Sequence, residues 1–167
     1  MRDQRRDDLG DDLPPDYASR VREGGFYGWP WFYIGGREDP RLKRLRPDLA
    51  GKASLPDVLI QPRSAPLGIS FYEARGGGGA FSAQYRGDAF VALHGSWNRG
   101  RRTGYKIVRL KLRNGVPDRT YEDFVTGFVT DAGQVTSRPV DTATAHDGAL
   151  LFTDDGGLIW RVAPAGR

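Results

Sequence analysis

The chain has 167 residues, of which 38% are hydrophobic and 28% charged, and its formal net charge is +4. This composition is typical of a folded globular protein and argues against intrinsic disorder. The absence of cysteine excludes disulfides, thiolate metal sites and a cysteine nucleophile. No apolar stretch approaches the roughly 18 residues of a membrane span. The mildly basic balance, with arginines often beside acidic residues, favours a solvated surface over nucleic-acid binding.

The first third of the chain is predicted to contain little regular structure. Residues 1–20 are polar and acidic, include two adjacent prolines and are predicted to form a loop. An aromatic run over 24–33, bounded by glycines, is typical of a strand. Residues 35–56 are charged and rich in turn residues, and a short strand is predicted at 57–61.

The rest of the chain carries an internal repeat. Ser64-Ala65-Pro66-Leu67 recurs as Ser137-Arg138-Pro139-Val140, and Ile107-Val108-Arg109 recurs as Ile159-Trp160-Arg161, in the same order. Repeated β units bury their faces by stacking on neighbours, and two copies are too few to close a ring. The sequence therefore predicts an all-β fold that is part of a larger stack of such units.

Alternation of apolar and polar residues locates the strands of the two units. The expected strands cover 67–72, 89–93, 105–112 and 121–128 in the first unit, and 140–145, 150–153 and 158–162 in the second. Asp147-Gly148 is a strong hairpin signal, and a second turn is predicted at Asp154-Asp155-Gly156-Gly157. The run Gly76–Gly79 lacks the following Lys-Ser/Thr of a phosphate loop and is interpreted as a flexible linker.

Three groups of polar residues are candidates for chemistry. The acidic loop over 7–16 offers oxygen ligands that suit a hard cation such as Ca²⁺, or it is simply solvated. His94 and Ser96 follow a predicted strand and invite a hydrolase hypothesis, although no G-x-S-x-G elbow is present and a structural histidine is the simpler alternative. Arg138 and Asp154 begin and end one two-strand unit, where they could clamp a carboxylate or form an ordinary ion pair.

Longer motifs resemble a known family. The segments Gly24-Gly25-Phe26-Tyr27-Gly28-Trp29-Pro30 and Tyr85-Arg86-Gly87-Asp88-Ala89-Phe90-Val91-Ala92-Leu93-His94-Gly95-Ser96-Trp97-Asn98-Arg99 are similar to the glucose/sorbosone dehydrogenase family, most of all to its sorbosone dehydrogenase branch. Ser64-Ala65-Pro66-Leu67-Gly68 and Asp154-Asp155-Gly156-Gly157 fit the same branch. The similarity extends over nearly the whole chain.

The resemblance implies a six-bladed β-propeller that binds pyrroloquinoline quinone (PQQ) and Ca²⁺ and oxidises sugars or related aldehydes and alcohols. In this family a histidine acts as general base while hydride passes to the quinone, which carries the redox chemistry. The base and its arginine partner lie in the first half of the propeller. Neither His94 nor His146 matches the base motif. The resemblance therefore assigns no catalytic residue here, and it implies that the chain alone is inactive.

The same resemblance divides the chain into four parts. They are an acidic loop (1–23), the end of one blade (24–62), one full blade (63–129) and an incomplete last blade (137–163), or about two blades plus the tail of a third. The implied metal-site residues are Arg6, Asp7 and Asp16. The implied cofactor-binding residues are Arg63, which stands where relatives often have His, together with His94, Arg99, Arg138 and Asp154.

The implied partners are a sugar or aldehyde substrate and the missing N-terminal half of the propeller. No nucleic acid or membrane span is expected, and the implied location is periplasmic or secreted. Two other functions stay open at this point. A propeller can keep a binding face without catalysis, and a hydrolase would use His94 and Ser96.

Overall fold

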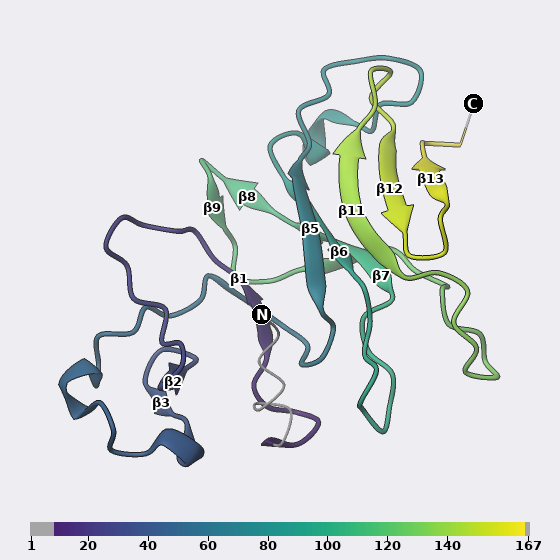
Figure 1. Ribbon diagram of the computed structural model, residues 1–167. Helices are drawn as coiled ribbons and strands as arrows, with labels where there is room; N and C mark the ends of the chain where they lie inside the picture. Colours follow the sequence, from purple (N-terminus) through teal and green to yellow (C-terminus); the bar gives the residue numbers. More distant parts are fainter. Residues whose placement is uncertain (1–8, 166–167) are drawn as a thin grey trace.

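The computed structural model describes residues 9–165, and over these residues the chain is built from β-strands, turns and short 3₁₀ segments. Figure 1 shows two larger sheets standing side by side, with the first third of the chain folded at one end of them as small hairpins and loops. The two larger sheets come from the two copies of the internal repeat.

The first copy forms an antiparallel sheet in the order β10-β7-β6-β5. Its strands are β5 (Pro66–Phe71), β6 (Ala89–Leu93), β7 (Lys106–Leu110) and β10 (Glu122–Val125). Every residue of β6 is buried, because this strand is covered on both faces of the sheet. The alternation expected along β7 is confirmed: Ile107 belongs to one apolar cluster, and Val108 and Leu110 belong to another on the opposite face.

The second copy forms an antiparallel sheet in the order β11-β12-β13. Its strands are β11 (Pro139–Thr144), β12 (Leu150–Asp154) and β13 (Ile159–Val162). The two turn predictions are confirmed. The N–H of Gly148 donates to the carbonyl of Ala145 in the first turn, and the N–H of Gly157 donates to the carbonyl of Asp154 in the second.

The two sheets pack face to face through an apolar cluster. Tyr72 and Phe90 from the first sheet are fully buried against Leu150 and Phe152 of the second. The hydroxyls of Ser70 in β5 and Thr142 in β11 lie 2.7 Å apart and share a hydrogen bond. Burial of such large side chains is the main stabilising contribution to the stack.

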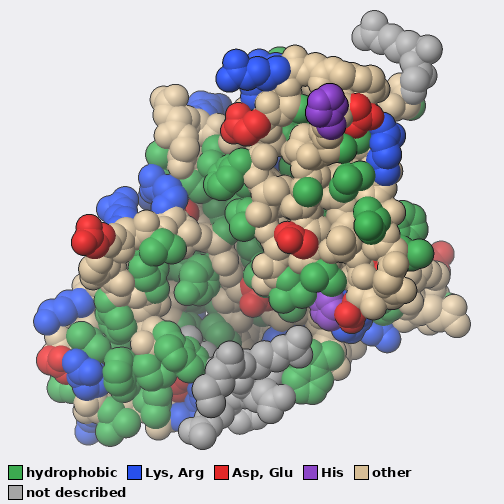
Figure 2. Space-filling view, turned by 45° about the horizontal axis from the view of Figure 1, so that its top comes forward, with side chains coloured by type: hydrophobic (Ala, Val, Ile, Leu, Met, Phe, Trp, Pro, Cys, Tyr) green, Lys and Arg blue, Asp and Glu red, His purple; other side chains and the backbone are tan. Residues whose placement is uncertain are grey.

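The remaining elements are short. They are the pairs β1 (Asp16–Ala18) with β4 (Val58–Ile60), β2 (Phe32–Tyr33) with β3 (Arg37–Glu38) and β8 (Leu112–Arg113) with β9 (Val116–Pro117), and the 3₁₀ segments η2 (Pro40–Leu42), η3 (Pro47–Leu49) and η4 (Ala83–Tyr85). The buried side chains of β4 join Val91 and Val108 in a second cluster on the other face of the first sheet. Figure 2 shows hydrophobic side chains gathered at the lower left, where β2 and β3 lie.

Two predictions for the first third were wrong. Residues 1–20 are not all loop, because Asp16–Ala18 pairs antiparallel with Val58–Ile60, a partner some forty residues away. The aromatic run over 24–33 is not a continuous strand. Gly28 has φ +96°, and the N–H of Phe32 donates to the carbonyl of Gly28, so the chain turns before the two-residue strand β2 begins.

The glycine run is also more than a linker. The N–H of Gly79 donates to the carbonyl of Asp147 in the hairpin between β11 and β12, at 3.0 Å. Gly77 has φ +109°, and a Cβ built there would overlap the Asp147 carbonyl. Gly77 and Gly79 leave no room for a side chain because the loop passes very close to the neighbouring sheet at these two positions.

Candidate functional site

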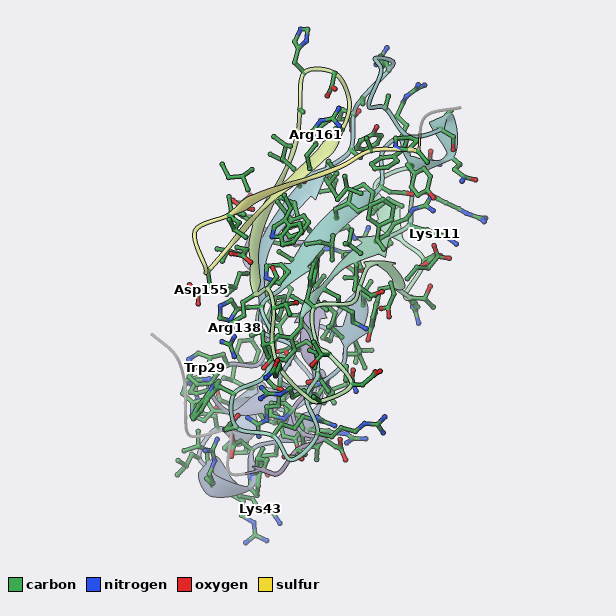
Figure 3. The ribbon with its side chains drawn as sticks, turned by 90° about the vertical axis from the view of Figure 1, so that its right-hand side faces the viewer. Trp29, Lys43, Lys111, Arg138, Asp155 and Arg161 are labelled. Carbon is green, nitrogen blue, oxygen red and sulfur yellow. The ribbon has the colours of Figure 1, made fainter. Side chains whose placement is uncertain are left out.

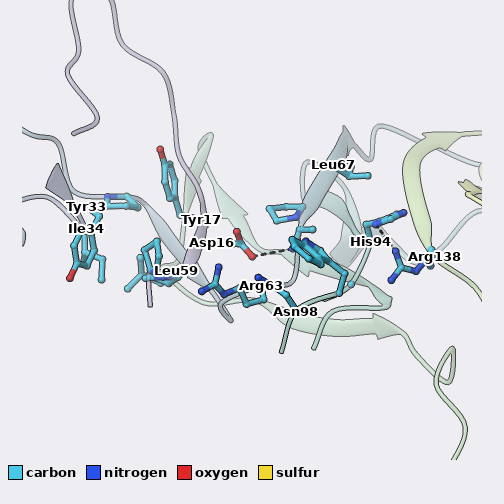
Figure 4. Close-up of a pocket in the computed structure, with 17 residues that line it drawn as sticks. Asp16, Tyr17, Tyr33, Ile34, Leu59, Arg63, Leu67, His94, Asn98 and Arg138 are labelled. Atoms are coloured by element: carbon cyan, nitrogen blue, oxygen red, sulfur yellow. Dashed lines mark hydrogen bonds between the residues drawn. The ribbon is translucent and has the colours of Figure 1, made fainter. Parts of the chain in front are cut away.

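A pocket of about 510 Å³ opens between the β1–β4 pair and the ends of β5 and β6 (Figure 4). Much of its wall is apolar or aromatic and includes Tyr17, Tyr33, Leu59, Leu67 and Trp97. Its polar lining residues are Asp16, Arg63, His94, Asn98 and Arg138. The pocket thus combines an apolar lining with a few polar groups, which is the usual composition of a small-molecule site.

The structure brings together four of the residues predicted from the sequence, namely Asp16, Arg63, His94 and Arg138. Arg99 and Asp154 do not line this pocket. Arg6 and Asp7 lie outside the described residues. None of the ligand roles is tested by this placement, and they stay predictions.

His94 and Arg138 meet because of the strand directions. His94 follows β6, Arg138 precedes β11, and Asp155 follows β12. All three therefore lie at the same end of the stacked sheets. Nη1 of Arg138 lies 3.5 Å from Nδ1 of His94. Nε2 of His94 lies 3.2 Å from Oδ2 of Asp155. Figure 3 shows Arg138 and Asp155 close together, with Arg161 at the other end of the sheets.

Tyr105 supports Arg138 from behind. Nη2 of Arg138 donates to the Tyr105 hydroxyl at 3.2 Å, and the guanidinium lies 5.3 Å from the centre of the ring. The Tyr105 hydroxyl donates in turn to the carbonyl of Ser96. Hydrogen bonding and cation–π attraction thus hold the arginine toward the pocket. Tyr105 stands just before β7, and no motif in the sequence around it signals this contact with Arg138.

Asp154 is the last residue of β12 and its carboxylate contacts the following turn, whereas its neighbour Asp155 faces His94. Oδ1 of Asp154 accepts from the N–H of Gly156 at 2.7 Å and of Leu158 at 3.4 Å. Burial acts to raise the pKa of Asp154, but the Ser137 side chain, these two N–H groups and the Trp160 indole together outweigh it and hold the pKa below its usual value. Asp154 does not line this pocket, because its carboxylate closes the turn into β13, and its role in cofactor binding stays a prediction.

Arg99 and Arg63 both donate to the acidic loop. Arg99 contacts the carbonyl of Asp11 and Oδ1 of Asp12, the latter at 2.8 Å. Nη2 of Arg63 donates to the carbonyl of Gly10 at 2.6 Å. Burial, and secondarily the charge of Arg99, lower the pKa of Arg63. Arg63 also lines the pocket, whereas Arg99 does not line it and instead donates hydrogen bonds to the loop.

Asp16 is the one described residue of the predicted metal site. Its Oδ2 accepts from the N–H of Ala65 at 3.0 Å. Burial raises the pKa of Asp16 more than this bond and one from Ser64 lower it. Asp16 is thus a partly desolvated carboxylate on the pocket wall (Figure 4).

The donor set fits the quinone better than the metal. An anionic planar quinone suits a pocket with two arginines and aromatic walls. For Ca²⁺, no group of three acidic or histidine side chains gathers among residues 9–165. The loop carbonyls of Gly10 and Asp11, which a hard cation would use, already accept from guanidinium groups. The described residues therefore do not form a Ca²⁺ site.

The hydrolase hypothesis has no geometric support. Ser96 is buried, and its hydroxyl oxygen accepts from the N–H of Thr103 at 3.1 Å. Within the described part of the chain no hydrogen bond joins Ser96 to His94, whose ring nitrogens face Arg138 and Asp155. A serine nucleophile needs a base within hydrogen-bond reach and access to substrate.

Within residues 9–165 no helix is long and apolar enough to cross a membrane. Among curated proteins, an uncharacterized protein of Borreliella burgdorferi is 36% identical over 164 residues, which is 96% of this chain and 42% of the relative. The chain therefore spans less than half of that relative.

Solved structures share the fold. The calcium structure of the Trichoderma reesei Carbohydrate-Active Enzymes Family AA12 protein has a TM-score of 0.61 and 21% identity, over 91% of this chain and 43% of that one. The apo form of the soluble aldose sugar dehydrogenase of Escherichia coli has a TM-score of 0.58 and 19% identity, over 90% and 38%. The holo PQQ domain of pyranose dehydrogenase from Coprinopsis cinerea has a TM-score of 0.50 and 26% identity, over 67% and 30%.

These likenesses confirm the expected fold class, an all-β chain forming part of a β-propeller. The family profile TrAA12-like matches residues 49–163, which is more than half of the chain. The resemblance to quinone-dependent sugar dehydrogenases is therefore confirmed at the level of the family, and the chain belongs to the TrAA12-like family.

Proposed function

We propose that this chain forms the quinone-binding part of a PQQ-dependent sugar dehydrogenase of the sorbosone type. The observation that carries the proposal is the placement of Arg138, His94 and Arg63 around one pocket with aromatic walls. The PQQ domain of Coprinopsis cinerea pyranose dehydrogenase, a neighbour in structure, supports the choice of cofactor. When bound, the quinone would supply the acceptor for hydride from a sugar or related aldehyde.

The chain's own residues would bind and orient that cofactor. Arg138 is directed by Tyr105 and His94, so its guanidinium is pre-positioned to receive a carboxylate. Arg63, which also lines the pocket, would add a second positive charge. Trp97 is 63% exposed, and its ring would cover one face of a planar ligand.

We do not assign a catalytic base to this chain. Both ring nitrogens of His94 face partners, Arg138 at one and Asp155 at the other. His146 lies in the turn between β11 and β12 and does not line the pocket. A base needs a free lone pair within reach of the substrate proton. The base would come from another part of the propeller, so the chain alone would bind cofactor without turning over sugar.

The remaining blades are the proposed partner. Leu67, Ile69 and Phe71 project from one face of β5 and are each more than half exposed. Such a stripe on a long strand suits an adjoining sheet. The proposal therefore includes a further propeller part that covers this stripe, whether in the same polypeptide or in another, and a periplasmic or secreted location for the assembled protein.

The test is a PQQ titration followed by tryptophan fluorescence. Arg138→Met is expected to weaken binding roughly 10- to 100-fold, since a hydrogen bond to a charged group contributes about 1.5–3 kcal/mol. The matched control is Arg113→Met, which removes an exposed arginine in β8 away from the pocket. Equal affinities for the two variants would refute the assignment. Sugar binding without any quinone binding would favour the non-catalytic binding module.

A further inference from the structure

The acidic loop at the pocket rim is held by arginines reaching from two distant segments. Nη2 of Arg63 donates to the carbonyls of Gly10 and Leu13, at 2.6 and 3.3 Å. Arg99 donates to the carbonyl of Asp11. The backbone carbonyls of three loop residues, Gly10, Asp11 and Leu13, therefore accept hydrogen bonds from two guanidinium groups.

Two carboxylates of the loop contact Arg99 and Gly100, the segment that also contacts the Asp11 carbonyl. Oδ1 of Asp12 accepts from Nη2 of Arg99 at 2.8 Å. Oδ2 of Asp11 accepts from the N–H of Gly100 at 3.0 Å. Only 10% of the Arg99 side chain is exposed, and it also donates to the carbonyl of Pro62 at 3.3 Å. Arg99 thus joins the acidic loop to the segment before Arg63.

Converging carbonyl and carboxylate oxygens are the usual ligands of a hard divalent cation. A guanidinium can satisfy the same oxygens, because it carries a permanent positive charge and five N–H donors in a plane. A carbonyl directed at a guanidinium at hydrogen-bond distance is not directed at a metal ion. Two arginines beside the loop would also repel a divalent cation from it.

We propose that Arg63 and Arg99 form a guanidinium clamp that docks the loop over residues 9–16 in place of Ca²⁺. The loop contributes Pro14, Pro15 and Asp16 to the pocket wall. The clamp therefore fixes one wall of the pocket without a metal. This inference concerns the docking of the loop and does not depend on which ligand the pocket takes.

Hydrogen–deuterium exchange of the purified chain, followed in peptides covering 9–17, tests the clamp. For the unmodified chain we expect the same exchange rate with millimolar Ca²⁺ as with EGTA. Arg99→Met is expected to speed exchange roughly 10-fold, as the loss of a charged hydrogen bond implies, and Ca²⁺ is expected not to restore it. The matched control is Arg101→Met, an exposed neighbour outside the clamp contacts, which should leave the loop unchanged.

Arg99→Lys keeps the charge but loses the forked geometry, and an intermediate rate is expected. This variant also keeps the test decisive if Arg99→Met fails to fold. Slower exchange of peptides 9–17 on adding Ca²⁺ to the unmodified chain would overturn the proposal. So would an exchange rate in both Arg99 variants equal to that of the unmodified chain.

Discussion

The Tyr72 hydroxyl joins the two stacked sheets, and its removal is expected to loosen them. It donates to the carbonyl of Gly148 at 2.7 Å and accepts from the N–H of Phe81 at 2.8 Å. The side chain is fully buried, so no water replaces it. Tyr72→Phe keeps the ring in the apolar cluster but leaves one buried donor and one acceptor unpaired.

Each unpaired buried group costs about 1–3 kcal/mol. Because the backbone can relax slightly at the Gly148 turn, we expect Tyr72→Phe to lower the free energy of unfolding by about 2 kcal/mol in total. Urea denaturation followed by circular dichroism and fluorescence measures this difference, provided the slope of the transition is unchanged.

Tyr121→Phe is the matched control. Its hydroxyl makes no hydrogen bond to another described residue, and its loss should change the free energy of unfolding by less than about 0.5 kcal/mol. If Tyr72→Phe were as stable as this control, the reasoning that the hydroxyl bridges the sheets would be refuted.

Three further predictions address the same architecture and the pocket. Gly77→Ala is expected to lower the melting temperature, since its φ is +109° and its Cβ would meet backbone, whereas Gly76→Ala, with open space around it, should have little effect. Asp155→Ala is expected to weaken PQQ binding a few-fold by releasing His94, and Asp155→Asn to retain binding, both measured by fluorescence titration. The hydrogen bond from Arg20 lowers the pKa of Asp57 to about 2, so the stabilisation by this pair should be complete above the unfolded-state pKa near 3.9 and be lost as pH falls through about 2. Urea titrations of Asp57→Asn and the unmodified chain at pH 6 and pH 2 should therefore differ at pH 6 and converge at pH 2.

Strands with a local signal could be predicted from the sequence. The alternation along β7 and the Asp-Gly turn after β11 depend on neighbouring residues, and the structure reproduces both. The strand β1 could not be predicted, because three residues become a strand only through pairing with β4. The aromatic run before β2 has strand-forming residues, but Gly28 turns the chain.

Some of the pocket residues could also be predicted from local sequence signals. His94 and Arg138 stand at strand ends, which the sequence indicates, but they belong to different sheets and meet only because the two sheets stack. Asp154 and Asp155 are adjacent in a turn, and the sequence does not tell which carboxylate closes the turn and which points outward. Arg99 suits an anionic cofactor by residue type, but its acceptors come from a loop almost ninety residues earlier.

We propose that the quinone binds in the pocket between β1, β4 and the ends of β5 and β6. Backbone amide spectra of the ¹⁵N-labelled chain, recorded while PQQ is added, test this residue by residue. We expect saturable shifts at Gly95, Trp97, Asn98 and Arg138, including the indole N–H of Trp97, with Asp147 at the far end of the sheets unchanged. Shifts confined to other surfaces, or no saturable shift at all, would contradict the account.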